Sequence, residues 1–337
     1  MLHIHSGDWS AKAASAFFGG THLAWTDNLF DGPLPDTDWD DPAWLDARAT
    51  ALAHYLGGRD RAATLLAKRY DIIRSALARG EELTLWFDSC LYDMMLLCQF
   101  LWFARDMLRN TRVSLICEEL RSDGSRFAGY AELDETEFKT MPARSRLLTE
   151  TMMREAWDGW KAFTSSHPEA WLSLARKKHR LTPFLAPAAQ RLLEQLPDPS
   201  GLNRLESEIL TAMNTGCSKL KPLFKSVSAM EDRPFFGDVV VWNTLNQLAA
   251  ASVPLVELHG PFPRIPVNVY PLPGDPGFNA EQWQVFLTEA GRLAIKAGGN
   301  SGCCLDGERW VANVKLTPGC GLSYDRIRRQ LNSGRDD

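Results

Sequence analysis

The stretch LTLWFDSCLYDMMLLCQFLWF, residues 83–103, is an apolar run with two carboxylates and a thiol, Asp88, Asp93 and Cys90, near its middle. Its first part, LTLWF, is almost continuously apolar, which is typical of a strand buried on both faces of a parallel sheet. The part from Leu91 onward is long and apolar enough for a buried helix. The polar residues Asp88, Ser89 and Cys90 therefore mark the point at which a buried strand ends and a helix begins.

The same alternation extends in both directions from this stretch. Short apolar strands are expected at the start of the chain, at 21–27 and at 112–120, and helical spacing is found over 9–20, 42–79 and 91–108. Strands that alternate with helices indicate a parallel sheet with right-handed crossovers. We therefore predict an α/β fold in which residues 1–128 form a Rossmann-like parallel-sheet domain.

The rest of the chain predicts two further units. Residues 129–199 have helical periodicity and no strand signal, and the segment PDPSG at 197–201 is a boundary. Three short helices followed by strands are then expected within residues 200–337. This order is typical of a winged helix, so we predict a helical connecting region and a winged-helix-like C-terminal domain.

The distribution of charge argues against nucleic acid as a partner. Residues 1–50 hold eight aspartates against Lys12 and Arg48, and no Lys or Arg occurs between Arg233 and Arg264. Basic residues supply most of the non-specific affinity for DNA, and the third C-terminal helix has none. DNA binding is therefore unlikely on this evidence, and a protein partner or a homo-oligomer formed through the winged-helix-like domain is the expected use of that surface.

The sequence also limits the location of the protein. No apolar run reaches the length of a membrane span, and the N-terminus lacks the basic start and apolar core of a signal peptide. The seven cysteines show no CxxC spacing, and Cys303 and Cys304 are adjacent, so neither a zinc site nor a disulfide framework is indicated. We expect a cytoplasmic protein that does not contact the membrane and has reduced thiols; no cofactor can be named.

The ends of the first three strands bring acidic groups to one edge of the predicted sheet. In open parallel sheets, ligands bind outside the carboxyl ends of the strands. The candidate ligand-binding residues, from the first two strand ends, are His5, Gly7, Asp8 and Asp27. The candidate catalytic residues, from the third strand end and the following helix, are Asp88, Cys90 and Asp93. We expect the four aspartates to surround one crevice.

Other interpretations of these residues stay open. Helix capping alone would explain an aspartate or serine at a strand-to-helix junction. A thiol near a helix N-terminus has a lowered pKa, which would make Cys90 a nucleophile with His5 as its nearest candidate base. His3 and His5 share a strand face and could bind metal with Asp8 or Asp27, although hydrogen-bonded histidines are the commoner case and no metal is predicted.

Several blocks of the chain resemble the DUF1835 family, whose function is not known. The blocks are LHIHSGD, WTDNLFDGPLP, LWFDSCLYDMMLL, PFLAPAAQRLL, GLNRLESEIL, PFFGDVVVW, LTEAGRL and RWVANVKL. Two positions depart from that family's pattern: Ser89-Cys90 replace a His-Asp pair, and Ala312-Asn313 replace Gly-Gly. If the His-Asp pair is catalytic, this chain has lost or changed that activity.

Two functions are compatible with the sequence. The first is a protein, either a binding protein or an enzyme, whose site for a small molecule or nucleotide lies at the carboxyl edge of the N-terminal sheet. The alternative is a ligand-responsive regulator whose winged-helix domain contacts DNA or a partner protein. The lack of basic residues in the third C-terminal helix favours the first.

Overall fold

A computed structural model describes residues 1–337 apart from 128, 270–276, 297–306 and 333–337. It shows a mixed α/β protein whose largest sheet has five strands in the order β2-β1-β3-β4-β5. The first four strands run parallel and the last is antiparallel to β4. The strands are β1 Leu2–His5, β2 Thr21–Ala24, β3 Leu83–Trp86, β4 Val113–Ile116 and β5 Arg146–Leu147. The predicted α/β fold with a parallel sheet is confirmed.

The strand β5 corrects the expectation that residues 129–199 contain no strand. It has two residues, Arg146 and Leu147, and both are exposed at the edge of the sheet. A strand this short has no alternation of buried and exposed positions, so no sequence pattern announces it.

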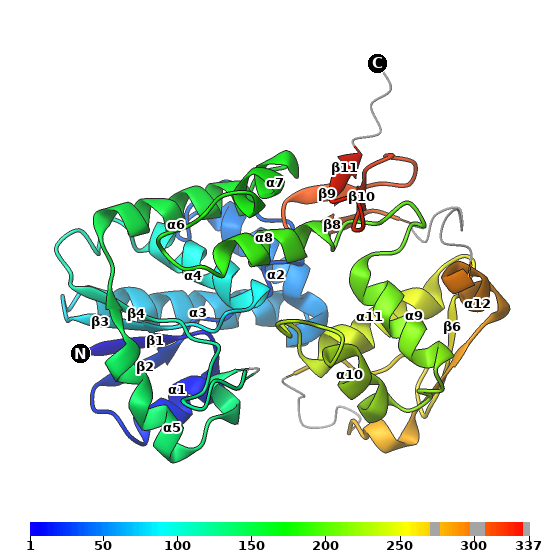
Figure 1. The fold of residues 1–337 in the computed structure, drawn as a ribbon, viewed down its shortest axis with the longest axis horizontal. Helices are drawn as coiled ribbons and strands as arrows, with labels where there is room; N and C mark the ends of the chain where they lie inside the picture. Colours follow the sequence, from blue (N-terminus) through cyan, green and yellow to red (C-terminus); the bar gives the residue numbers. More distant parts are fainter. Residues whose placement is uncertain (128, 270–276, 297–306, 333–337) are drawn as a thin grey trace.

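Helices cover both faces of the sheet (Figure 1). On one face, Leu2, Ile4 and Leu85 join a core that contains the apolar residues of α3 and α4. On the other face, Trp86 and Ile116 pack with α1 and α5 in a second, smaller cluster. The helices are α1 Asp8–Ser15, α2 Pro42–Leu56, α3 Arg59–Leu77, α4 Leu91–Phe103 and α5 Glu135–Thr140.

The helical spacing predicted over residues 42–79 is divided between α2 and α3. Gly57 ends α2 with φ 81°, and Gly58 precedes α3 with φ 115°. Only glycine adopts such angles without a steric cost. The chain therefore reverses at the pair, and α2 packs against α3 along their lengths.

The helix α4 lies at the centre of this part of the protein. Nearly all of its residues are buried, because β3 and the sheet lie on one side of it and α6 and α8 on the other. A helix that is apolar all round is stable only when it is enclosed in this way. The connecting helices are α6 Glu150–Phe163, α7 Glu169–Ala175 and α8 Leu185–Leu193, with short 3-10 turns at Tyr130–Glu132 and Met141–Arg144.

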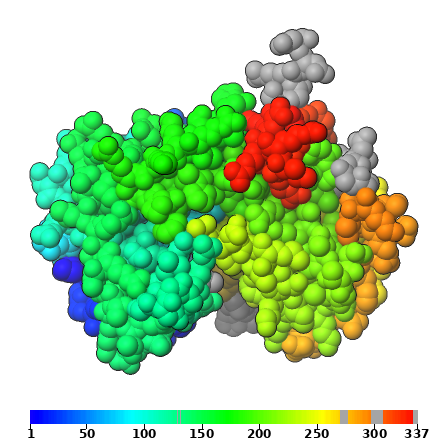
Figure 2. Space-filling model, in the orientation of Figure 1, coloured from blue at the N-terminus to red at the C-terminus, as the bar shows by residue number. Residues whose placement is uncertain are grey.

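Three helices and an antiparallel strand pair form the next unit. The helices are α9 Arg204–Asn214, α10 Leu220–Ser228 and α11 Asp238–Ala250. The paired strands are β6 Val256–His259 and β7 Gln284–Leu287. A 3-10 turn at Ala280–Gln282 precedes β7, and α12 Glu289–Lys296 follows it. In the space-filling view, this unit and the α/β part form two lobes separated by a recess (Figure 2). The order matches the expected one, and the winged-helix assignment itself stays a prediction.

The last strands pack back on the first half of the chain. They form two hairpins, β8 Arg309–Val311 with β9 Val314–Leu316, and β10 Ser323–Asp325 with β11 Gln330–Asn332. The Asn313 side chain accepts a hydrogen bond from the Leu34 N–H and donates one to the Thr164 carbonyl. Ala312 has φ 47°, a conformation that favours glycine. Ala312-Asn313, one of the two departures from the DUF1835 pattern, therefore forms the turn between β8 and β9, and Asn313 ties this turn to Leu34 and Thr164.

Two sequence expectations concern membranes and cysteines. No helix in the described ranges is both long and apolar enough to cross a membrane. The five cysteines that the structure describes are free thiols. Cys303 and Cys304 lie outside the described residues.

Candidate functional site

The carboxyl ends of the parallel strands lie at one edge of the sheet, but their acidic groups face two cavities. Asp8 and Asp27 line a cavity of about 400 Å³. Asp88 and Cys90 line a second one of about 190 Å³. The backbone N–H of Asp88 donates a hydrogen bond to the buried Asp93, which lies behind the second cavity. The expectation of a single crevice is therefore wrong, because α4 begins between the two cavities.

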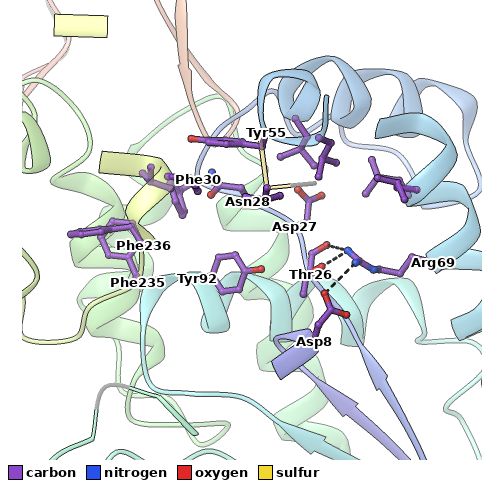
Figure 3. A pocket seen from close by; sticks show the side chains of 18 residues that line it. Asp8, Thr26, Asp27, Asn28, Phe30, Tyr55, Arg69, Tyr92, Phe235 and Phe236 are labelled. Atoms are coloured by element: carbon purple, nitrogen blue, oxygen red, sulfur yellow. Dashed lines mark hydrogen bonds and ion pairs between the residues drawn. The ribbon is translucent and has the colours of Figure 1, made fainter. Parts of the chain in front are cut away.

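The larger cavity, which we call the ring-lined cavity, lies between the sheet edge and the start of α11 (Figure 3). Its walls come from the ends of β1 and β2, from α2, α3 and the first turn of α4, and from residues 235–240. Five aromatic side chains line it: Phe30, Tyr55, Tyr92, Phe235 and Phe236. Such a mostly apolar concave surface with few polar groups is typical of small-molecule sites.

The polar groups of the ring-lined cavity gather at the strand ends (Figure 3). Arg69 donates hydrogen bonds to the carbonyl oxygen of Thr26, at 2.9 Å, and to its hydroxyl. The same guanidinium lies 3.9 Å from the Asp8 carboxylate, whose side chain is 68% exposed. Gly7 precedes α1 with open space where a Cβ would lie and with no side chain capping the helix. A ligand would therefore meet both charges and the start of α1.

Asp27 lines the cavity but is engaged by Arg48. Both side chains are buried, and Arg48 donates to the two carboxylate oxygens at 2.6 and 3.0 Å. Arg48 also donates to the carbonyl oxygens of Asn28, Asp31 and Pro33. Its guanidinium therefore fixes the loop after β2, which carries Phe30 into the cavity. Asp27 therefore helps to position this loop through Arg48, and its ligand-binding role stays a prediction, since it also lines the cavity.

We predict that Arg48→Met lowers the free energy of unfolding by about 3–5 kcal/mol, because it leaves the Asp27 carboxylate buried without its partner. Urea denaturation measures this change. The matched control is Arg59→Met, which removes an exposed ion pair with Asp46 and should change stability by less than about 1 kcal/mol. Equal effects of the two substitutions would contradict the role of Arg48.

The side chains at the junction between β3 and α4 form a compact cluster of Asp88, Cys90 and Asp93. Asp93 accepts hydrogen bonds from the Asp88 backbone N–H at 2.6 Å and from the Cys90 thiol at 3.1 Å. Asp88 accepts one from the backbone N–H of Tyr130 at 3.3 Å. Cys90, and not Asp88 or Ser89, occupies the N-cap position of α4. No described side chain caps α4, and Asp93 in its first turn accepts from the Asp88 N–H before the helix, so only the dipole part of the capping interpretation fits Asp93.

Burial controls the proton affinities in this cluster. Burial and the neighbouring Asp93 raise the pKa of Asp88 well above its ordinary value, and burial also raises the pKa of Asp93. Two carboxyls this close hold a proton between them at a higher pH than either would alone. Asp88 faces the smaller cavity, so the arrangement can present a proton to a bound group there.

The environment of Cys90 contradicts the expected nucleophile. Burial, followed by the charges of Asp93 and Asp88, raises the pKa of the thiol well above its ordinary value. The helix N-terminus would lower this pKa, but it is outweighed by the absence of solvent and by two carboxyls. His5, the candidate base, does not hydrogen-bond to the thiol, because its ring nitrogens face Ser10 and His22.

We predict that Cys90 reacts slowly with iodoacetamide at pH 7.5 in the folded protein, because alkylation needs an exposed thiolate. The partly exposed Cys217 and Cys320 serve as internal controls in the same sample. Mass spectrometry of peptides from a time course measures each site. Labelling of Cys90 ahead of both controls would restore the nucleophile hypothesis.

His5 lies on the face of the sheet covered by α1, away from the ring-lined cavity. Its Nδ1 accepts a hydrogen bond from the Ser10 hydroxyl at 3.1 Å, and its Nε2 donates to His22 Nδ1 at 3.1 Å. His22 in turn donates from Nε2 to the Phe18 carbonyl. Burial lowers the pKa of both rings and keeps them neutral, and the Phe18 carbonyl, which can only accept, then places the proton of His22 on Nε2 and sets the direction of the other two hydrogen bonds. The predicted ligand-binding role of His5 is not supported by this position.

His3 is held in the same way beside them. It accepts from the indole N–H of Trp86 and donates to the Gly19 carbonyl, and its ring stacks on His22 at 4.3 Å between centroids. Burial and then the nearby His22 lower the pKa of His3 to about 4 and that of His5 to about 2. Among the described residues, no group of three His, Cys, Asp or Glu side chains is arranged to hold a metal ion.

The histidine cluster predicts acid sensitivity. Unfolded histidines take up protons near pH 6.5, whereas His3 and His5 stay neutral in the folded protein down to about pH 4 and below. The unfolded state therefore binds more protons in this range, and the free energy of unfolding falls as the pH falls from 6.5 toward 4. The slope is up to about 1.4 kcal/mol per pH unit for each ring.

Urea denaturation at several pH values tests this prediction. His5→Gln should reduce the slope by up to about 1.4 kcal/mol per pH unit, since it removes one ring that takes up a proton on unfolding. The control is His167→Gln, at an exposed position, which should leave the slope unchanged. A wild-type free energy of unfolding that is constant from pH 6.5 to 4.5 would contradict the prediction.

Sequence reasoning missed several residues of the ring-lined cavity. Arg48, which holds the loop behind the cavity, left one signal, since it is one of two basic residues among eight aspartates in the first fifty positions. Arg69 and Tyr92 occupy ordinary helical positions, and Phe235-Phe236 is a short apolar pair nearly 150 residues after the end of β3. Only the folded chain brings these groups together.

Comparison with known proteins adds no further constraint on the site. No family model matches the chain, and no curated protein matches it. The DUF1835 resemblance therefore stays a prediction.

Proposed function

We propose that the protein is a cytoplasmic protein that binds a small molecule, or a nucleotide, in the ring-lined cavity. One observation carries the proposal: a cavity of about 400 Å³ with five aromatic walls opens at the carboxyl edge of the parallel sheet. This is the edge at which parallel sheets bind ligands. The volume is within the usual range for a small-molecule site.

The walls favour a ligand with a flat ring and a polar end. Aromatic side chains stack on planar rings in offset or edge-to-face contacts, and Tyr92 and Phe236 enter the cavity from one side of it (Figure 3). The other side carries Arg69, Thr26 and Asp8. A nucleobase or another heterocycle with hydrogen-bonding groups fits both sides.

The proposal is binding and not catalysis. The groups best suited to proton transfer are Asp88, which lines the smaller cavity, and its neighbour Asp93; neither lines the ring-lined cavity. Its charged pair, Arg69 with Asp8, suits recognition of a polar substituent.

The alternative is a regulator whose C-terminal unit contacts DNA or a partner protein. We propose a winged-helix arrangement for residues 204–287, supported by the helix order and by a bridge between Lys219 and Gln284 that extends the β6–β7 pair. In this arrangement α11 would be the recognition helix. Its residues Val239 and Val240 instead line the ring-lined cavity, and Asn243 hydrogen-bonds Tyr55 on α2. This packing favours the binding function and disfavours DNA.

A panel of nucleosides, nucleotides and heterocyclic metabolites tests the proposal by thermal shift and calorimetry with the full chain. We expect at least one compound to stabilise the protein. Tyr92→Leu should weaken its binding by about two- to tenfold, because a ring contact contributes about 0.5–1.5 kcal/mol beyond its burial. The control is Trp102→Leu at the other end of α4, which should leave binding unchanged. A panel without any stabilising compound, or equal affinity in both variants, would count against this function.

A further inference from the structure

A third cavity lies where several distant segments of the chain meet. It has a volume of about 190 Å³, about half that of the ring-lined cavity, and we call it the Arg309 cavity. Its lining comes from the loop after β2, from α2 and α11, from the residues before and at the start of α9, and from strand β8. Phe30, Tyr55 and Val240 line both this cavity and the ring-lined one, so these side chains form the wall between them.

Arg309 presents one edge of its guanidinium without a partner. Its Nη1 donates to Glu206 at 2.6 Å, and the Glu206 side chain is 4% exposed. Glu206 is itself fixed, because it forms a capping box with Asn203 at the start of α9. The Nε and Nη2 atoms of Arg309 are buried and have no hydrogen-bond partner among the described residues. These two atoms are one of the paired donor edges with which arginine binds a carboxylate.

Two acceptors accompany this donor edge. Gln195 lines the cavity, is 6% exposed, and has a buried side-chain oxygen with no partner among the residues that the structure describes. A buried polar atom left unpaired destabilises the fold, so a partner for it is favoured. The Asp31 carboxylate also lines the cavity, and one of its oxygens accepts hydrogen bonds from Asn28 and Tyr55.

We propose that the Arg309 cavity binds a small α-amino acid. The ligand carboxylate would pair with Nε and Nη2 of Arg309, and its ammonium group would donate to the Gln195 side-chain oxygen and to Asp31. The Asp31 carboxylate disfavours a ligand that carries only a negative charge, because the carboxylate and the ligand would repel each other. A cavity of about 190 Å³ limits the ligand to about one amino acid, and alanine and serine are small probes that carry both charged groups. This site is separate from the ring-lined cavity and does not depend on the function proposed for it.

Thermal shift and calorimetry of the full chain with L-alanine and L-serine test the inference. We expect stabilisation at about 10 mM ligand, since a ligand that binds only the folded state raises the melting temperature by mass action. Acetate and methylammonium each carry one of the two charged groups and should stabilise the protein less than alanine. Equal stabilisation by acetate, or none by either amino acid, would overturn the proposal.

Two variants locate the binding. Arg309→Lys keeps a charge for Glu206 but removes the paired donor edge, and Gln195→Leu removes the acceptor while preserving the size of the side chain; each should weaken alanine binding tenfold or more, about 1.4 kcal/mol. The control is Arg326→Lys, whose arginine pairs with Asp198 outside the cavity. If Arg309→Lys does not fold, Gln195→Leu carries the test. Unchanged affinity in Gln195→Leu would place any amino acid elsewhere.

Discussion

The buried ion pair between Arg48 and Asp27 is the interaction on which the geometry of the candidate site depends. It joins α2 to the end of β2, and the same guanidinium binds three carbonyl oxygens of the following loop. A desolvated arginine is costly unless all of its donors are satisfied, and here the loop has to close around it. Phe30 lines both the ring-lined cavity and the Arg309 cavity, and Asp31 lines the Arg309 cavity. The closure of the loop around Arg48 sets the positions of both residues.

The acidic groups at the sheet edge illustrate how burial divides similar residues between different tasks. Asp8 is exposed beside Arg69, Asp27 is neutralised by Arg48, and Asp88 is paired with Asp93. All of them follow a strand or begin a helix, so the sequence alone assigns them the same role. Their different surroundings come from their partners: Arg69 and Arg48 belong to distant helices, and only Asp93 and Cys90 are close to Asp88 in the sequence.

The sequence predicts the strands and helices better than the site, because the former depend on local patterns and the latter depends on contacts between distant residues. The apolar run at 83–103 is dominated by its own composition, and the structure forms β3 and α4 from it. The alternation along the first 120 residues is similarly local. In contrast, β5 is too short to have a pattern, and Phe235, Phe236 and Arg309 enter their cavities through contacts across more than a hundred residues.

The walls of the ring-lined cavity come from both halves of the chain, and this has a consequence for synthesis on the ribosome. Phe30, Tyr55 and Tyr92 emerge long before Phe235 and Phe236. Until the later pair arrives, the nascent α/β part exposes an apolar surface that the finished protein encloses. Such transiently exposed surface is a target for aggregation and for chaperones, so the surface that encloses the cavity in the finished protein is a liability during its translation.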